Sequence, residues 1–356
     1  MIRTSQHAYG ACEAPQMSLE ADVGDGFNGS RSSARGEPTQ AIGSGLCSFD
    51  ERTSGAPMNT LTPLLEPLRT PPGPSPRRGR HVLARLNYLQ PTAERPYSYA
   101  CEPPPGTPWE NCEYEPRQME IRDARLADKP PCIDSEGYAL WDAPTSVTDF
   151  LDTEAVRARY YPEAAELALA ATGATRAYVF DHLVRRREPD RAALTFGRQR
   201  ANDVAAANGR IHNDYTEASG RKRLALVLDD PEAVARVRRF AIVNVWRSIK
   251  GPVLDTPLAV CDARTLTVSD LVVSDVRYPR RTGEIYVALH SPLHRWSYFS
   301  QMDRHEALVF KQYDSRVSGV ARFTPHTAFD LPDIPAGAPL RESIELRCLV
   351  VYGDAQ

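Results

Sequence analysis

The feature that most constrains this chain is the motif His212-Asn213-Asp214, at the start of its most strand-rich half. Side chains of a β-strand alternate between two faces, so His212 and Asp214 point to the same side. An imidazole and a carboxylate on one face are two of the three ligands of the facial triad that holds non-haem Fe(II). The motif therefore predicts that a histidine from a later strand completes the site.

Two downstream histidines could supply this third ligand. His326 follows His212 by 114 residues and precedes the last predicted strand, which leaves enough chain for the intervening strands of a rolled sheet. His294 is the rival, 82 residues after His212. We favour His326 and keep His294 as the alternative.

The last predicted strand carries residues that could bind a cosubstrate carboxylate. Arg341 and Ser343 share one face of it, and the forked guanidinium of arginine suits a bidentate pair with a carboxylate. We expect Arg341 and Ser343 to bind the distal carboxylate of 2-oxoglutarate. Arg347 lies on the same face and is a second candidate, but an ion pair with Glu345 would explain it equally well.

Composition limits the class of protein. Of the 356 residues, 42% are hydrophobic and 25% are charged, which is enough for a sizeable core. The net charge of −3 gives no reason to expect a nucleic acid or an acidic membrane surface as partner. No apolar run approaches the roughly 18 residues that a membrane-spanning helix needs. We expect neither nucleic acid nor membrane among the partners.

Cysteine usage indicates the compartment. The seven cysteines are odd in number and form no Cys-x-x-Cys pair, and the N-terminus lacks the basic-then-apolar pattern of a secretory signal. This pattern favours reduced thiols and a cytoplasmic protein.

The chain divides near residue 80. Residues 1–80 are poor in large apolar side chains, so we expect a disordered tail that ends in a Pro/Arg-rich linker. Residues 81–356 form one predicted domain, mainly β with flanking helices. Short strands separated by turns predict that its core, about 205–352, is a double-stranded β-helix, or jelly roll.

Local patterns predict further elements. Helical structure is expected over 147–173, with Asp152 or Thr153 as cap and Gly173 as terminator. A strand should follow at 176–182, then an irregular, lid-like loop up to Asn208. A short helix should begin at Asp230 and end near Phe240. Strands are also expected at 82–89, 118–125, 242–247, 258–261, 284–288, 296–299, 307–310 and 344–352.

Several of these segments together resemble a known family. The chain from about His81 to Tyr352 is similar to the group that contains the 7α-cephem-methoxylase component, gibberellin desaturase-like proteins and fungal hydroxylase/desaturases. The resemblance implies Fe(II)/2-oxoglutarate-type oxidation of a secondary-metabolite scaffold. The segments that carry it are Leu86-Asn87-Tyr88, His212-Asn213-Asp214-Tyr215-Thr216, Asn244-Val245-Trp246-Arg247, Gly251-Pro252-Val253, Pro257-Leu258-Ala259, His294-Arg295-Trp296, Lys311-Gln312-Tyr313-Asp314-Ser315 and Arg341-Glu342-Ser343-Ile344-Glu345-Leu346-Arg347.

Two other readings of the sequence stay open. A non-catalytic partner protein could use the same barrel, and a cupin-type metal enzyme could use the metal without 2-oxoglutarate. Hydroxylation and desaturation share the same predicted ligands. The sequence therefore indicates a small natural-product substrate without naming it, and it leaves the oligomeric state open.

Overall fold

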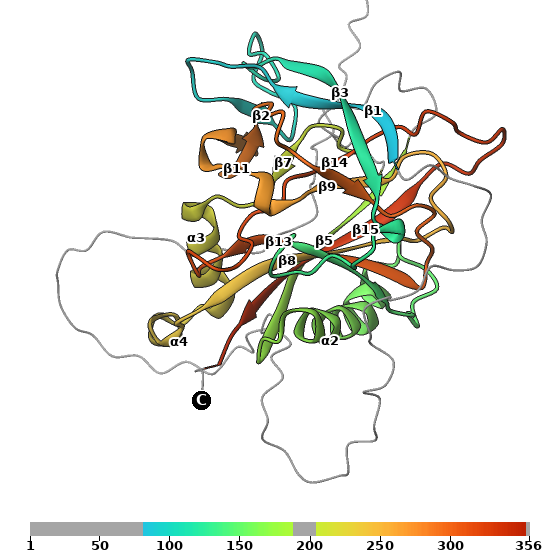
Figure 1. The fold of residues 1–356 in the computed structure, drawn as a ribbon. Coiled ribbons are helices and arrows are strands. Elements are labelled where there is room, and N and C mark those ends of the chain that lie inside the picture. The colour runs from blue at the N-terminus through green and yellow to red at the C-terminus, as the bar shows by residue number, and fades with distance from the viewer. Residues whose placement is uncertain (1–80, 188–203, 354–356) are drawn as a thin grey trace, which may run out of the picture. The chain divides into compact units, whose positions relative to one another are not determined.

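The computed structural model describes residues 81–187 and 204–353 of the chain (Figure 1). The predicted disordered segment 1–80 lies outside these residues, as does most of the predicted lid-like loop. All described residues belong to one compact unit.

Two β-sheets make up most of this unit. The larger has nine strands in the order β1-β3-β12-β9-β14-β7-β11-β10-β2. Its bounds along that order are His81–Leu89, Tyr114–Asp123, Trp296–Tyr298, Leu258–Cys261, His326–Ala328, His212–Asn213, Thr282–Ala288, Leu271–Arg277 and Tyr97–Tyr99. Isolated bridges join Asn87 to Arg210 and Leu89 to Leu289, so β1 also reaches the β7 and β11 side and the sheet curls.

The smaller sheet has six strands in the order β4-β13-β8-β15-β5-β6. In this order, the strands span Tyr138–Asp142, Glu306–Asp314, Phe240–Ser248, Glu342–Val351, Arg176–Arg186 and Ala205–Ala206. Side chains of β4, β8 and β13 pack against side chains of β9 in one buried apolar cluster, so the two sheets are layered face to face. The predicted jelly-roll fold is confirmed.

Alternation along the central strands gives the six-stranded sheet two different faces. On β15, Ile344 and Leu346 belong to an apolar cluster together with residues of α2, whereas Glu345 faces the other sheet. On β8, Val245 faces the same apolar cluster and Trp246 the other sheet. Because the period of a strand is two, one face is left free to carry polar groups between the sheets.

The helical segment predicted before β5 is present. It consists of α1 (Thr153–Ala155), a π-helical turn η2 (Val156–Tyr160) and α2 (Tyr161–Thr172). The Asp152 carboxylate accepts from two backbone amides at its start, and Gly173 ends it at φ 67°. In Figure 1, α2 lies against the six-stranded sheet, where it covers the apolar face.

Other helices differ from the expectation. Helix α3 (Glu217–Leu228) was not predicted, because its polar and basic sequence leaves only Gly220, Leu224 and Val227 buried. Helix α4 (Pro231–Arg236) ends before the predicted Phe240, since that residue already begins β8. The short 3-10 turns are η1 (Ala124–Leu126), η3 (Ala263–Thr265) and η4 (Val268–Asp270).

One segment predicted as a loop is partly a strand, and another strand was not predicted. β5 continues past His182 to Arg186, because it pairs with β15 along its whole length. Strand β10 (Leu271–Arg277) was missed, because Asp275 and Arg277 interrupt the apolar pattern in its second half.

The apolar face predicts a stability difference. Leu346 is fully buried in the centre of the six-stranded sheet, whereas the side chain of Leu83 on β1 is 54% exposed. Leu346→Ala should lower the free energy of unfolding by about 2–5 kcal/mol, through lost burial and a new cavity. Leu83→Ala should change it by about 0.5 kcal/mol at most. Urea unfolding measures both, and equal effects would contradict this assignment of the core.

Candidate metal centre

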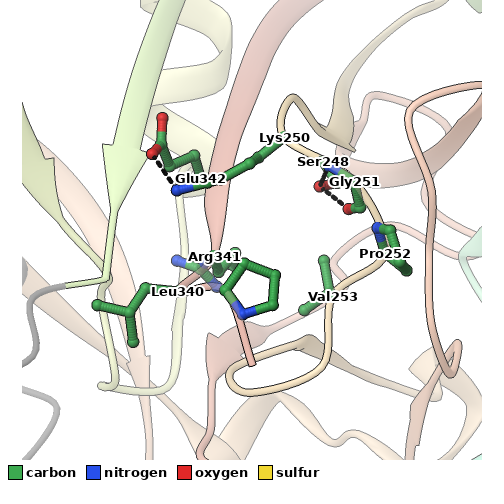
Figure 2. Close-up of a pocket in the computed structure, with 9 residues that line it drawn as sticks. Ser248, Lys250, Gly251, Pro252, Val253, Leu340, Arg341 and Glu342 are labelled. Carbon is green, nitrogen blue, oxygen red and sulfur yellow. Dashed lines mark hydrogen bonds and ion pairs between the residues drawn. The ribbon is translucent and has the colours of Figure 1, made fainter. Parts of the chain in front are cut away.

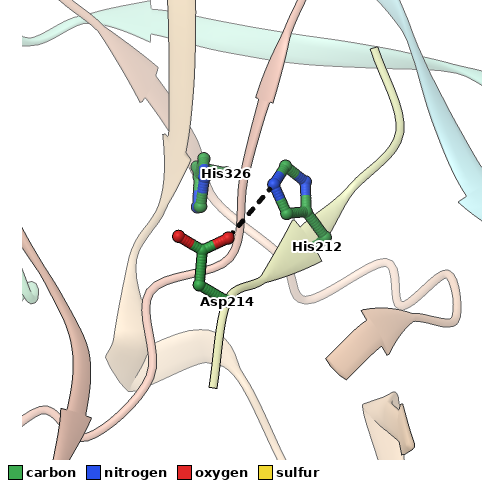
Figure 3. Close-up of side chains that lie close together, drawn as sticks. All are labelled: His212, Asp214 and His326. Atoms are coloured by element: carbon green, nitrogen blue, oxygen red, sulfur yellow. Dashed lines mark ion pairs between the residues drawn. The ribbon is translucent and has the colours of Figure 1, made fainter. Parts of the chain in front are cut away.

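Three side chains from two adjacent strands converge between the sheets (Figure 3). His212 opens β7, Asp214 follows that strand directly, and His326 opens β14. β7 and β14 are antiparallel, and His212 and His326 are partners in the register. One ligand atom from each of the three residues lies within 4.8 Å of the others. Two imidazoles and one carboxylate thus surround one point.

The orientation of the rings leaves nitrogen atoms free for a ligand. Nδ1 of His212 lies 2.8 Å from the carbonyl oxygen of Arg210, which can only accept, so Nδ1 carries the proton. Nε2 of His212 is then unprotonated and lies 3.6 Å from Oδ1 of Asp214. Nε2 of His326 lies 4.0 Å from Oε2 of Glu345, which is beyond hydrogen-bond distance. These donors fit a divalent cation.

The charge states also suit a metal. Burial lowers the pKa of both His212 and His326 to about 4. Burial alone would raise the pKa of Asp214, but Arg347 and the two imidazoles outweigh it and hold that pKa well below its usual range. At neutral pH the cluster therefore offers two neutral imidazoles and one carboxylate, the protonation states that metal binding requires.

A hollow of about 290 Å³, a volume that includes space open to solvent, adjoins the two histidines. Arg341 lines it, and burial lowers the pKa of its guanidinium to about 10. Nη1 of Arg341 donates to the Thr256 carbonyl at 2.9 Å, but its Nε is buried without a hydrogen-bond partner in the described part of the chain. The other residues that line this hollow are Arg185, Asn208, His212, Trp246, Leu258, His326, Ala328 and Glu345.

Arg341 also lines a second hollow (Figure 2). There it adjoins the turn after β8, and Lys250 of that turn forms an ion pair with Glu342 at 3.1 Å. Arg341 is thus shared by the two hollows.

The remaining predicted cosubstrate residues lie apart from the hollow. Ser343 is buried on β15 beside Ser248 and Arg185 in the sheet register, and it does not line the hollow. Arg347 donates to three carboxylates, those of Asp214, Asp181 and Glu345. The ion pair with Glu345, the alternative explanation of Arg347, is therefore present.

The rival ligand His294 lies elsewhere. Its Nδ1 is 3.1 Å from the Tyr88 hydroxyl and its Nε2 is 3.3 Å from a carboxylate oxygen of Asp270. It is not part of the cluster around His212.

The lining residues that were not expected from the sequence as part of a site include three with charged or amide side chains: Arg185, Asn208 and Glu345. Arg185 was hidden because the predicted strand ended at His182, so its face could not be assigned. Glu345 had been considered only as a partner of Arg347, although it shares the face of Ser343 on the same strand.

The lowered imidazole pKa values predict a pH effect on the metal-free protein. Between pH 6.5 and about 4, the unfolded chain binds protons at His212 and His326 that the folded chain does not. The free energy of unfolding should therefore fall as the pH drops through this window. Above pH 6.5 the contribution of the two neutral histidines to stability is fully present. Urea unfolding in the presence of a chelator measures this. His326→Gln should flatten the dependence, and an unchanged slope would contradict burial of a neutral imidazole.

None of the helices in the described part of the chain combines the length and the apolar character needed to span a bilayer.

A family model described as "Oxidoreductase/YMDC permease-like domain" matches residues 86–351. A solved structure of the iron and alpha-ketoglutarate-dependent endoperoxidase NvfI superposes with a TM-score of 0.66 and 28% identity. It covers 77% of this chain and 99% of that one.

Curated relatives agree with this match. Hydroxylase/desaturase CTB9 of Cercospora beticola is 33% identical over 261 residues, covering 68% of this chain and 79% of the relative. The Fe(II)/2-oxoglutarate-dependent dioxygenase nvfI of Aspergillus novofumigatus is 32% identical over 281 residues, covering 76% and 96%. The chain belongs to this oxidoreductase family of fungal hydroxylase/desaturases and Fe(II)/2-oxoglutarate-dependent dioxygenases.

Proposed function

We propose that the protein is a non-haem Fe(II)/2-oxoglutarate-dependent oxygenase that hydroxylates or desaturates a small secondary metabolite. The observation that carries the proposal is the convergence of two imidazoles and one carboxylate on one point between the sheets. This donor set is the facial triad of non-haem Fe(II) oxygenases. The names of the relatives agree with it.

We assign the metal to His212, Asp214 and His326. When bound, Fe(II) and 2-oxoglutarate would let O₂ act as the oxidant that removes hydrogen from an unactivated C–H bond, while 2-oxoglutarate is oxidised to succinate and CO₂. The role of the protein would be to hold the ion through these three side chains and to leave the other side of the ion open. Its layered sheets exclude water, and the carbonyl of Arg210 keeps the His212 ring in the ligating tautomer.

We assign the distal carboxylate of 2-oxoglutarate to Arg341. What supports this is that Arg341 lines the same hollow as His212 and His326 and has a buried Nε without a hydrogen-bond partner among the described residues. Ser343 stays a proposed contact on the sequence pattern. Arg347 is the weaker candidate, since three carboxylates already surround it.

We propose a natural product as substrate and expect no nucleic acid or membrane partner. The names of relatives include hydroxylase/desaturase and endoperoxidase, so more than one oxidative outcome occurs among them. We place the protein in the cytoplasm. The support is the odd number of cysteines in the sequence and the free thiols of Cys112, Cys132, Cys261 and Cys348.

The ligand assignment predicts opposite results for the two downstream histidines. His326→Gln and Asp214→Ala should abolish iron uptake and iron-dependent formation of succinate from 2-oxoglutarate, since each removes one of three ligands. His294→Gln, which changes an equally buried histidine, should retain both. Iron content and succinate release by purified protein measure this. Iron uptake without succinate under any tested substrate would instead favour the non-catalytic partner protein.

The cosubstrate assignment predicts a change in KM. Arg341→Gln should raise the KM for 2-oxoglutarate about tenfold or more, because a charged hydrogen bond contributes about 1.5–3 kcal/mol. Lys250→Gln removes a nearby, half-exposed cation and should leave this KM unchanged. Steady-state kinetics over a range of 2-oxoglutarate measures both. Turnover that needs no 2-oxoglutarate in wild type would favour the cupin-type enzyme.

A further inference from the structure

The two carboxylate oxygens of Asp214 have different surroundings. Oδ1 faces His212, whereas Oδ2 accepts two hydrogen bonds, from Nε of Arg347 at 2.8 Å and from Nδ2 of Asn244 at 2.9 Å. The backbone N–H of Asp214 also donates to Oε1 of Gln312 at 2.7 Å. The carboxylate is therefore held in one orientation, with Oδ1 as its free oxygen.

Arg347 and Asn244, which donate to Oδ2, form one row with Asp181 across three adjacent strands. Arg347 of β15 is the register partner of Asn244 on β8 and of Asp181 on β5. Nη1 of Arg347 donates to Asp181 at 2.9 Å, so the guanidinium is fixed from the side away from Asp214. Neighbouring backbones set the position of this row, and the side chain of Arg347 has little freedom to leave it.

A second carboxylate lies within reach of the cluster. Oε2 of Glu345 is 4.0 Å from Nε2 of His326, and the side chain of Glu345 is at least as buried as that of Asp214. Its other oxygen, Oε1, accepts from Nη2 of Arg347 at 3.1 Å. One guanidinium thus binds both acidic side chains that adjoin the histidines, on two different nitrogens.

We propose that Arg347, together with Asn244, is a positioning residue of the metal centre: it makes Asp214 a ligand through Oδ1 alone and holds Glu345 out of the coordination shell. The consequence is a shell with three protein ligands and one open side. The proposal rests on the proposed function, because it assumes that His212, Asp214 and His326 bind the ion. The sequence makes both Arg341 and Arg347 candidates for binding the carboxylate of 2-oxoglutarate, and the proposal gives Arg347 a different role.

Co(II) tests the proposal, because its visible absorption reports the ligands of the ion without any turnover. Arg347→Gln and Asn244→Leu should each weaken Co(II) binding by about 10- to 100-fold, as is typical when a group that orients a metal ligand is lost. The spectrum of the loaded Arg347→Gln protein should change, since Glu345 is released toward the ion. The KM for 2-oxoglutarate should stay at the wild-type value, and Arg347→Lys should restore part of the affinity.

Arg247→Gln is the matched control. Arg247 is a buried arginine on β8 that donates to the Tyr160 hydroxyl, on the opposite face of the same sheet. Its loss should leave the Co(II) affinity and spectrum unchanged, which separates positioning from general damage to the sheet. If Arg347→Gln does not fold, Asn244→Leu and Arg347→Lys decide the question in the same assay.

The outcomes are distinguishable from failure of the proposed function. Wild-type affinity and spectrum in both Asn244→Leu and Arg347→Gln would overturn the positioning role while the metal site stands. A raised KM for 2-oxoglutarate in Arg347→Gln, with unchanged Co(II) binding, would overturn it too and would make Arg347 the cosubstrate residue. A wild-type protein that binds no Co(II) would overturn both proposals.

Discussion

The antiparallel pairing of β7 with β14 is the contact on which the site depends, because it sets His212 opposite His326. These strands are only two and three residues long, so their own ladder is weak. Asn213, between His212 and Asp214, supplies the missing support. Its amide donates to the Gln312 carbonyl and its oxygen accepts from the Thr324 backbone N–H. The middle residue of the motif thus ties the ligands to the opposite sheet and to the segment before His326.

The space between the sheets holds an unusual amount of charge. Removing a charge from water is costly unless partners compensate it, so buried charges occur in pairs and networks. Arg347 compensates Asp214, Asp181 and Glu345 at once, while the imidazoles avoid the cost by staying neutral. Arg185 and Arg341 line the adjoining hollow and add positive charge beside the histidines.

Much of the fold and of the cluster could be predicted from local patterns. Period two set His212 and Asp214 on one face, and the caps Asp152 and Gly173 marked the ends of the helical segment that covers the second sheet. Helix α3 could not be predicted in this way. Its buried side is formed mainly by Leu224 and Val227, and a further contact is the close approach of Gly220 to the ring of Tyr313, which hydrophobic periodicity does not detect.

The arginines illustrate the same limit. Period two places Arg341 and Arg347 on a common face, but it does not say which strands flank β15. Arg347 lies opposite Asn244 and Asp181 because β8 and β5 are its neighbours, whereas Arg341 precedes the strand and turns to the hollow. The order of the strands in the sheet therefore decides which arginine can contact the cosubstrate and which one joins an ion-pair network. That order depends on the whole chain.

The most direct measurement of the central claim is an anomalous difference map at the iron absorption edge from crystals grown with Fe(II) under anaerobic conditions. The account predicts one strong peak between the rings of His212 and His326, next to Oδ1 of Asp214. A peak coordinated by His294 or by Glu345 in place of these groups, or none in an iron-saturated crystal, would contradict it.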